Sequence, residues 1–375
     1  MAPTETIPML NLQAQYLRLK PEIDAAIQEV LYAANYIQGP AVKSFAKALA
    51  DYQNIQYVIP CANGTDALQL AIMALDMPKG SEIITPGFSY IAVAEVCKLL
   101  GYQPVYLDVD AKTFNIDIQQ LQDALTAKTK AIIPVHLFGQ SAHMEPILNF
   151  AQQHGLYVIE DNAQSIGAEY TFSDGRKVKT GCMGHISTTS FFPSKNLGAY
   201  GDAGAVMTND AQLAERLQQI ANHGQVQKYQ HQIVGVNSRM DTLQAAILSV
   251  KLKYLDAFIA ERQAVANAYN QAFQAIQGVQ IPFVPSFTTH VYHQYTLVLK
   301  HPVEAIRAAL LAEGVASMVY YPKPINDHLP YKSQEQLPVA QALCQSVLSL
   351  PIGTDMTDAQ IQTIINTFKN SLTHT

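Results

Sequence analysis

The sequence contains no tryptophan, and only four of its 375 residues are cysteines. The cysteines are scattered and form no Cys-x-x-Cys pair: Cys61, Cys97, Cys182 and Cys344. This spacing argues against a zinc site or a disulfide framework and is typical of a reducing compartment. We therefore expect a soluble cytoplasmic protein without a bound metal.

Charged residues are also scarce, at 14% of the chain, and the net charge is only −6. Because the lysines and arginines form no dense run, the sequence argues against nucleic acid or an anionic membrane as the main partner. No apolar run approaches the roughly 18 residues needed to span a bilayer. The first thirty residues are interrupted by polar residues and proline, unlike a signal peptide.

Apolar residues, in contrast, make up 49% of the sequence, enough for a large core and two domains. Short apolar runs alternate with helical patterns through the first two-thirds of the chain, which predicts an α/β fold with a mainly parallel sheet. The predicted strands are 57–60, 82–85, 104–109, 131–135, 157–160, 186–191 and 205–208. The predicted helices between them include 66–75, 92–100 and 145–154.

The last third has a different pattern, in which two β-like segments are flanked by helical ones, and this predicts a smaller α+β domain. We expect a long helix over 240–273, strands at 290–299 and 316–321, and a helix at 303–313. A final amphipathic helix is predicted by the apolar stripe Ile361, Ile364, Ile365 and Phe368. The expected division is a large domain over residues 1–250 and a small domain over 251–375, with an N-terminal helix that could pack on the small domain.

Lys195 is the most informative residue, because it is a lone lysine in the uncharged, aromatic and glycine-rich run Ser190–Gly204. A desolvated lysine has a lowered pKa and can attack carbonyls as a free amine. Asp161 ends another predicted strand, where burial of a carboxylate is costly without a cationic partner. A protonated pyridine nitrogen would be such a partner, so the two residues together suggest pyridoxal phosphate chemistry. Alone, each also fits an ordinary role, a solvated loop lysine and a helix-capping aspartate.

A candidate phosphate site follows the first predicted strand, at Gly64 and Thr65. Glycine allows a ligand to approach the backbone, and the amides of a starting helix attract anions. Ser190 could reach the same phosphate. The alternative is an ordinary helix start with Thr65 or Asp66 as the N-cap, which fits this short motif at least as well.

Two further side chains could contact a flat cofactor ring. Tyr90 follows a predicted strand and could stack on the ring, although such an aromatic residue more often serves packing alone. Gln164, one helical turn after Asp161, could donate a hydrogen bond to a phenolate oxygen of that ring.

Taken together, these motifs closely resemble the DegT/StrS-type nucleotide-sugar aminotransferases, a branch of the fold-type-I pyridoxal phosphate enzymes. The resemblance covers almost the whole chain and is closest to the subgroup that aminates carbon 3. It rests on the segments Asn63–Leu68, Pro134–Gly139, Glu160–Ser165, Ser190–Gly204, Gly235–Leu248 and Leu348–Pro351.

The resemblance implies an aspartate-aminotransferase-like large domain, with a mainly parallel seven-stranded sheet, and a role for each matching residue. Lys195 would hold the cofactor through a Schiff base, and Asp161 would pair with its pyridine nitrogen. The other implied cofactor contacts are Gly64, Thr65, Tyr90, Gln164 and Ser190. In a homodimer with shared active sites, Asn237 would reach the partner's cofactor phosphate.

The substrate contacts implied by the resemblance are Arg239, Tyr320, Tyr321 and His328. Arg239 could face the sugar nucleotide or a substrate carboxylate, or could form an interface salt bridge instead. Many relatives carry a Leu-His pair where this chain has Ile325-Asn-Asp-His328, so the histidine is displaced, or replaced by Asn326.

The implied reaction moves the amino group of L-glutamate to a nucleotide-linked keto sugar for a cell-surface glycan, such as lipopolysaccharide O-antigen. UDP-2-acetamido-3-oxo-glucuronate is slightly preferred, because Arg239 could bind its carboxylate. A dTDP-linked 3-oxo-6-deoxyhexose and amination at carbon 4 are the alternatives. A sugar dehydratase is disfavoured, because those relatives replace the lysine with histidine. A regulator that binds the cofactor without turnover is also possible, although no DNA-binding segment is evident.

Overall fold

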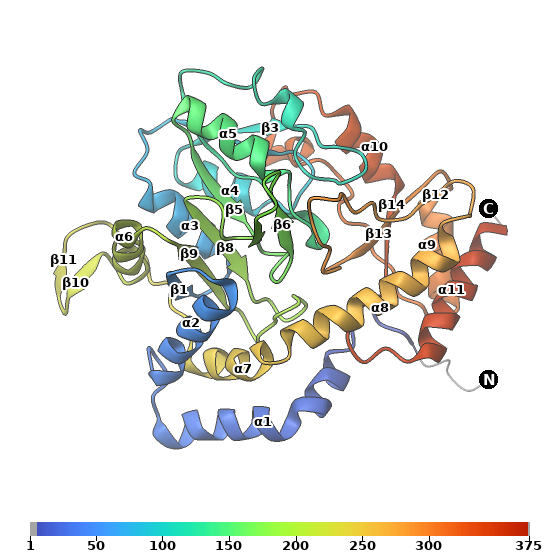
Figure 1. The fold of residues 1–375 in the computed structure, drawn as a ribbon, viewed down its shortest axis with the longest axis horizontal. Helices are drawn as coiled ribbons and strands as arrows, with labels where there is room; N and C mark the ends of the chain where they lie inside the picture. Colours follow the sequence, from blue (N-terminus) through green and yellow to red (C-terminus); the bar gives the residue numbers. More distant parts are fainter. Residues whose placement is uncertain (1–5, 374–375) are drawn as a thin grey trace.

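The structure, a computed structural model, describes residues 6–373, and a seven-stranded sheet forms the centre of its larger part (Figure 1). The strands lie in the order β1 (Tyr57–Cys61), β9 (Gly204–Thr208), β8 (Ile186–Ser190), β5 (Tyr157–Asp161), β4 (Thr129–Ile132), β2 (Glu82–Pro86) and β3 (Gln103–Leu107). Only β9 runs antiparallel to its neighbours β1 and β8. The predicted mainly parallel sheet is therefore confirmed, with strand ends shifted by a few residues.

Helices cover both faces of this sheet. One face carries α3 (Gly64–Ala74), α4 (Ala92–Leu99) and α6 (Ala211–Ala221). The other carries α2 (Pro40–Gln53), α5 (Met144–His154) and α7 (Thr242–Leu252). Because side chains alternate along a strand, consecutive residues such as Ile83 and Ile84 enter the two different cores, and both are fully buried. Burial on both faces explains why the strands read as continuous apolar runs.

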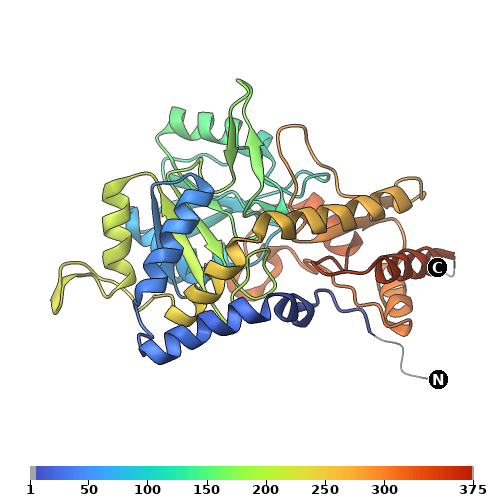
Figure 2. The same ribbon diagram turned by 60° about the horizontal axis from the view of Figure 1, so that its bottom comes forward.

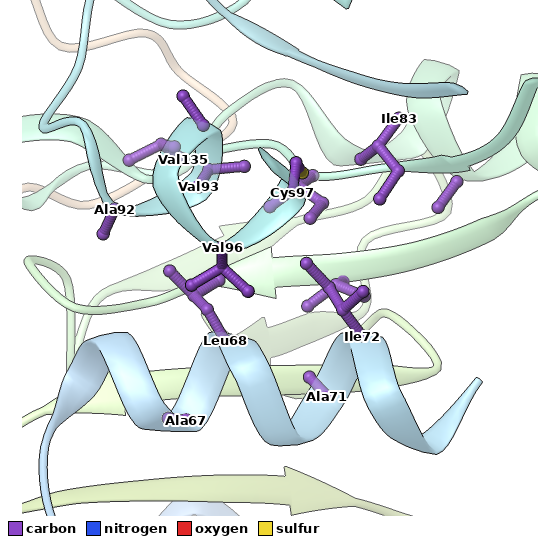
Figure 3. Close-up of a cluster of buried hydrophobic side chains, with 14 of the residues drawn as sticks. Ala67, Leu68, Ala71, Ile72, Ile83, Ala92, Val93, Val96, Cys97 and Val135 are labelled. Atoms are coloured by element: carbon purple, nitrogen blue, oxygen red, sulfur yellow. The ribbon is translucent and has the colours of Figure 1, made fainter. Parts of the chain in front are cut away.

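Helix α3 shows how the sequence pattern becomes packing. Leu68 and Ile72 lie four residues apart and so share one side of the helix, which faces Val96 and Cys97 of α4 (Figure 3). All four side chains are nearly or fully buried. This apolar contact fixes α3 on the sheet and with it the loop that precedes the helix, where the candidate phosphate site lies.

A second apolar core lies in the C-terminal part, at the right of Figure 1. It is built from α8 (Leu255–Phe273), α9 (Val303–Ala312), α11 (Asp358–Thr373) and the antiparallel strands β12 (Val279–Gln280), β13 (Tyr295–Leu299) and β14 (Val347–Leu350). The predicted stripe of α11, from Ile361 to Phe368, is buried in this core. Helix α10 (Pro338–Ser346) packs instead against the core of the larger part.

Three predicted elements differ from the structure. The long helix over 240–273 is two helices, α7 and α8, separated by a turn at Lys253–Tyr254. The strand predicted over 290–299 begins only at Tyr295, because the preceding segment bends at Tyr292, whose φ is +46°. The strand predicted over 316–321 is a loop that pairs with β14 only at Met318. In each case the apolar residues are spaced for burial against neighbouring elements. They do not belong to a single continuous helix or strand.

The N-terminal segment connects the two parts of the molecule. Helix α1 (Leu12–Ala33) packs Leu19 and Ile23 against α7 and α8, as the view in Figure 2 shows from below. Ile7 forms a bridge with Val315, and the Gln15 side chain donates a hydrogen bond to Thr354. The predicted domain boundary at residue 250 stays a prediction.

The remaining short elements of residues 6–373 are two hairpins and four 3₁₀ turns. They are β6 (Glu169–Thr171) with β7 (Lys177–Lys179), β10 (Gln225–Gln227) with β11 (Gln230–His231), and the turns Ile118–Gln120, Leu137–Gly139, Ile325–Asp327 and Leu329–Tyr331. The β10–β11 hairpin projects from the body of the molecule (Figure 1). Across residues 6–373, no helix combines the length and apolar character needed to cross a membrane.

Candidate active site

A pocket of about 640 Å³ opens at the carboxyl ends of the central strands, where open α/β sheets usually bind their ligands. Side chains and loops from β1, β2, β5 and β8 line it, together with the loop that follows α9. The predicted residues in its lining are Gly64, Thr65, Tyr90, Asp161, Gln164, Ser190, Lys195, Tyr320 and Tyr321. The fold therefore brings together positions that are far apart in the sequence.

Lys195 lies in the turn that leaves β8, and its backbone N–H donates to the Phe192 carbonyl at 2.8 Å. The turn is tight, because a Cβ on Gly198 would lie 2.3 Å from the Pro193 carbonyl oxygen. Burial lowers the pKa of the Lys195 amine to about 8, although the charge of Asp161 opposes this shift. More of the Lys195 amine is therefore unprotonated near neutral pH than in an ordinary lysine, and the unprotonated amine is the form that attacks a carbonyl.

Asp161 is 8% exposed at the end of β5, and its Oδ1 accepts the Ala163 N–H at 3.0 Å. Burial raises the pKa of this carboxyl, while the Ala163 N–H, Lys195 and His136 act in the opposite direction. The carboxylate is thus only partly stabilised by the chain itself. A protonated pyridine nitrogen would supply the missing cation, so the site fits the predicted cofactor.

A buried pair, Glu160 and His136, fixes the strand end that carries Asp161. His136 Nε2 lies 2.9 Å from Glu160 Oε2, while its Nδ1 accepts the Ala142 N–H at 3.1 Å. The Glu160 carboxylate also accepts the backbone N–H groups of Gly181, Met183 and Gly184. The backbone N–H of His136 donates to the backbone carbonyl of Asp161 at 3.0 Å.

The candidate phosphate site is the start of α3. Asn63 is its N-cap, because its side chain accepts the Asp66 N–H at 2.8 Å. The alternative of Thr65 or Asp66 as the N-cap is therefore wrong. A Cβ on Gly64 would lie 2.7 Å from the Cβ of Ser190, so only glycine leaves room between the helix start and β8. The resulting cradle is suited to an anion.

Gln164 lies between the two parts of the molecule. Its Oε1 accepts the Phe138 N–H at 2.9 Å, and its Nε2 donates to the Tyr321 hydroxyl at 3.1 Å. One Nε2 proton remains for a ligand, which is compatible with the predicted contact to a ring oxygen. Tyr90 is 58% exposed, and its ring centroid lies 6.4 Å from that of Tyr321.

The pocket also contains residues that sequence reasoning missed. His293 is buried near Lys195, and its Nδ1 has no hydrogen-bond partner among residues 6–373. Burial holds the pKa of His293 well below its usual range. Phe192 and Asp202 are exposed at the pocket. Phe192 and Asp202 lie within the run Ser190–Gly204, so their position beside Lys195 was a signal for the site. His293 gave no such signal, because it was assigned to the strand predicted over 290–299, which begins only at Tyr295.

Three predicted residues lie outside this pocket. Asn237 is exposed, and Arg239 lines a second pocket of about 670 Å³, where its Nη1 donates to Asn222. His328 does not line either pocket, and the Asn326 side chain donates to the Glu335 carbonyl instead of pointing to a ligand. Their roles stay predictions. In the described part of the chain, no cluster of three or more His, Cys, Asp or Glu side chains suits a metal ion.

Fold and pocket together define an α/β protein in which a lysine of lowered pKa, a buried carboxylate and the start of a helix line one pocket. A model of the DegT/DnrJ/EryC1/StrS aminotransferase family matches residues 18–369, and the chain belongs to this family. The predicted family, fold class and aminotransferase activity are therefore confirmed.

Two curated relatives align over nearly the whole chain. The UDP-2-acetamido-2-deoxy-3-oxo-D-glucuronate aminotransferase of Pseudomonas aeruginosa is 46% identical, over 97% of this chain and 100% of its own length. The UDP-N-acetyl-3-dehydro-alpha-D-glucosamine 3-aminotransferase of Acidithiobacillus ferrooxidans is 40% identical, over 99% and 100%. Among solved structures, NtdA from Bacillus subtilis with bound cofactor PMP superposes with a TM-score of 0.89 at 30% identity, covering 98% of this chain and 85% of NtdA.

Proposed function

We propose that this protein transfers the amino group of L-glutamate to carbon 3 of UDP-2-acetamido-3-oxo-glucuronate. The single observation that carries the chemistry is that Lys195 and Asp161 meet in one pocket beside the Gly64 cradle. The choice of sugar is supported by the Pseudomonas aeruginosa relative, which is named for that substrate. The cofactor is pyridoxal phosphate, as predicted from Lys195 and Asp161; the related NtdA contains its amino form, PMP.

Each pocket residue has a defined task in this reaction. When bound, pyridoxal phosphate provides an electron sink for the carbon that loses a proton. Lys195 acts as the general base that takes this proton and returns it, which its lowered pKa favours. Asp161 would hold the proton on the ring nitrogen, and the helix start at Gly64 and Thr65, together with Ser190, would hold the phosphate; all four residues line the pocket.

The charge of the pocket supports an active site completed by a second copy of the chain. Among its described lining residues, Lys195 is the one Lys or Arg side chain, and Asp202 adds a negative charge. The proposed substrate carries a diphosphate and a carboxylate, so it needs additional cations. Arg239 of the partner subunit could supply one of them.

The segment around Arg239 is suited to such a contact. Asn237 is exposed and Arg239 partly exposed, whereas Ser238 and Met240 are buried, so the chain alternates as an extended segment does. Asn237 and Arg239 therefore face outward on the same side. Asn237 would bind the partner's cofactor phosphate, while Arg239 would face the sugar nucleotide.

Exposed apolar side chains in the β10–β11 segment and at the end of α1 are a second argument for a homodimer. Tyr229 and Val234, in and beside the projecting β10–β11 hairpin, are both 83% exposed, and Tyr32 at the end of α1 is 89% exposed. Large exposed apolar side chains concentrated in projecting elements are typical of a protein–protein interface. We infer that a second copy covers them.

The biological setting is also part of the proposal. The substrate is a precursor of cell-surface glycans such as lipopolysaccharide O-antigen, and the reaction would take place in the cytoplasm. The four cysteines are free thiols, which is compatible with a reducing compartment.

The first test uses the absorbance of the bound cofactor. Adding L-glutamate to the wild type should remove the visible band and release 2-oxoglutarate, because the amino group passes to the cofactor. Lys195→Ala should abolish the response and lower turnover by about 1000-fold or more, since it removes both attachment and the general base. Lys47→Ala, which changes an exposed lysine paired with Asp51, is the matched control and should behave as the wild type.

A panel of UDP- and dTDP-linked 3-oxo and 4-oxo sugars then tests the acceptor, with loss of the amino form of the cofactor as readout. We expect the UDP-linked 3-oxo-glucuronate to give the highest kcat/KM. If a dTDP-linked 3-oxo-6-deoxyhexose or a 4-oxo sugar were turned over faster, the proposed substrate would be wrong and the faster sugar would take its place in the proposal. If glutamate never changed the spectrum of the cofactor-loaded wild type, the glutamate-dependent reaction itself would be wrong.

A further inference from the structure

Lys251 is a buried lysine that the proposed reaction does not use. It lies near the end of α7, is 1% exposed, and donates from Nζ to the Gly198 carbonyl at 2.5 Å. Its Nζ also lies 5.0 Å from the centroid of the Tyr200 ring. Within residues 6–373 no carboxylate forms an ion pair with this lysine.

Such a position is unfavourable for a cation. Burial lowers the pKa of Lys251 to about 7, and the charge of Arg262 adds to the effect. A buried ammonium without a carboxylate loses its hydration with little compensation, so an apolar residue of similar size would cost less. The presence of lysine here therefore suggests that its hydrogen bond serves a purpose other than the stability of the fold.

A second residue of α7 contacts the same loop. Gln244 lies seven residues before Lys251 and so on the same side of the helix, two turns away. Its Oε1 accepts the Tyr200 N–H at 2.9 Å, and its Nε2 donates to the Tyr200 carbonyl at 3.3 Å. Helix α7, which lies between α1 and α2 in Figure 1, thus holds the backbone at both Gly198 and Tyr200.

The segment held in this way is the turn of Lys195. Gly198 is three residues after Lys195 and is buried, and there is no space for a Cβ between it and Pro193. The Ala199 N–H donates to the Phe191 carbonyl at 2.8 Å, which closes the turn. In so tight a turn, a displacement of the Gly198 carbonyl must also move the backbone of Lys195.

We propose that Lys251 is a positioning residue for Lys195, holding the Gly198 carbonyl so that the amine is presented at the correct depth in the pocket. Without this donor the Gly198 carbonyl would be buried and unsatisfied, and the turn would rearrange to reach another partner. Lys251 itself touches neither substrate nor cofactor. The proposal rests on the proposed function only in that Lys195 is the reacting amine.

The test compares Lys251→Met, which keeps the length and apolar volume, with Lys253→Met as the matched control. Lys253 lies just beyond the end of α7 and is exposed, 3.5 Å from Glu22. Hydrogen exchange of the cofactor-free proteins should become faster in the segment 195–201 of Lys251→Met only. With cofactor bound, kcat should fall about tenfold at unchanged KM for glutamate, since small misplacements of a reacting group cost up to about 100-fold.

The visible band of the bound cofactor gives a readout that loss of stability alone would not move. Its pH titration reports the attachment at Lys195 and should shift in Lys251→Met but not in Lys253→Met. Lys251→Gln keeps a donor and should retain the wild-type titration with a kcat within about threefold. Lys251→Leu, which also lacks a donor, replaces the methionine variant if that chain does not fold.

Unchanged exchange and titration in folded Lys251→Met would overturn the proposal, as would a loss in Lys251→Gln as large as in Lys251→Met. The loop measurement needs no turnover. If exchange over 195–201 changes as expected while Lys195→Ala leaves the glutamate response intact, the proposed function fails but the contact between Lys251 and the loop stands.

Discussion

At the scale of single residues, burial shifts two pKa values of the pocket in opposite directions. Desolvation lowers the pKa of Lys195 and raises that of Asp161, because it disfavours the charged form of each. More of the lysine is therefore in its nucleophilic, unprotonated form. The ionised form of the Asp161 carboxyl, in turn, is stable only beside a cation. The same physical effect prepares both side chains for a ligand with a carbonyl and a ring nitrogen.

Asp161→Asn should make the cofactor-free protein more stable at neutral pH. Because the folded-state pKa of Asp161 is raised, the wild type loses stability as pH increases above the unfolded value of about 3.9, whereas the amide does not titrate. Urea unfolding of the two cofactor-free proteins at pH 7 and near pH 3 measures this. The variant's advantage should be present at pH 7 and absent near pH 3. An equal difference at both pH values would contradict the assignment.

At the scale of elements, one carboxylate ties helix α10 to the central sheet. Asp108 follows β3, is 2% exposed, and accepts the backbone N–H groups of Val339 and Ala340, each at 2.8 Å. The first turn of α10 is thus capped from a distance of more than 200 positions in sequence. This capping ties the start of α10 to the end of β3.

Asp108→Ala should lower the free energy of unfolding by about 2 kcal/mol, since two buried charge-assisted hydrogen bonds and a helix cap are lost together. Asp210→Ala is the comparison, because Asp210 caps α6 locally through Gln212 and Leu213 at an exposed site. It should cost about 1 kcal/mol. Denaturant unfolding of both variants checks the order, and a smaller loss for Asp108→Ala than for Asp210→Ala would show that the distant cap is not a major contact.

At the scale of the whole molecule, the pocket joins the two parts of the chain. Tyr321 comes from the C-terminal part, yet its hydroxyl accepts a hydrogen bond from Gln164 beside the central sheet. Asn237 and Arg239, in contrast, face away from the pocket of their own chain. The proposed complete site therefore needs both parts of one chain and a segment of a second copy.

Hybrid dimers test this arrangement. Asn237→Ala and Lys195→Ala should each be inactive as homodimers, because one lacks a phosphate contact and the other lacks the amine. Mixing them should restore activity, since one of the two sites in a mixed dimer would combine an intact Lys195 with an intact Asn237 of the partner subunit. About half the wild-type activity per mixed dimer is expected from one intact site of two. No recovery in mixtures shown to contain hybrid dimers would argue against shared sites.

Much of the fold was predictable because its signals are local. The buried strands read as apolar runs, and the stripe of α11 has helical spacing, so both were assigned from the sequence. The first half of the strand predicted over 290–299 and the strand predicted over 316–321 were wrong, because apolar residues there are buried in irregular backbone. His293 was missed as a pocket residue for the same reason.

The sequence by itself predicted the cofactor, since Lys195 and Asp161 together suggest pyridoxal phosphate chemistry and the motifs around them resemble one enzyme family. Only the tertiary structure decided how these groups are supported. The donation from Lys251 to Gly198, the cap of α10 by Asp108 and the bridge from Gln164 to Tyr321 join residues far apart in the chain. Such contacts depend on how layers pack, which no local pattern encodes. The outward orientation of Asn237 and Arg239 was likewise set by packing, because burial of Ser238 and Met240 turns them away from their own pocket.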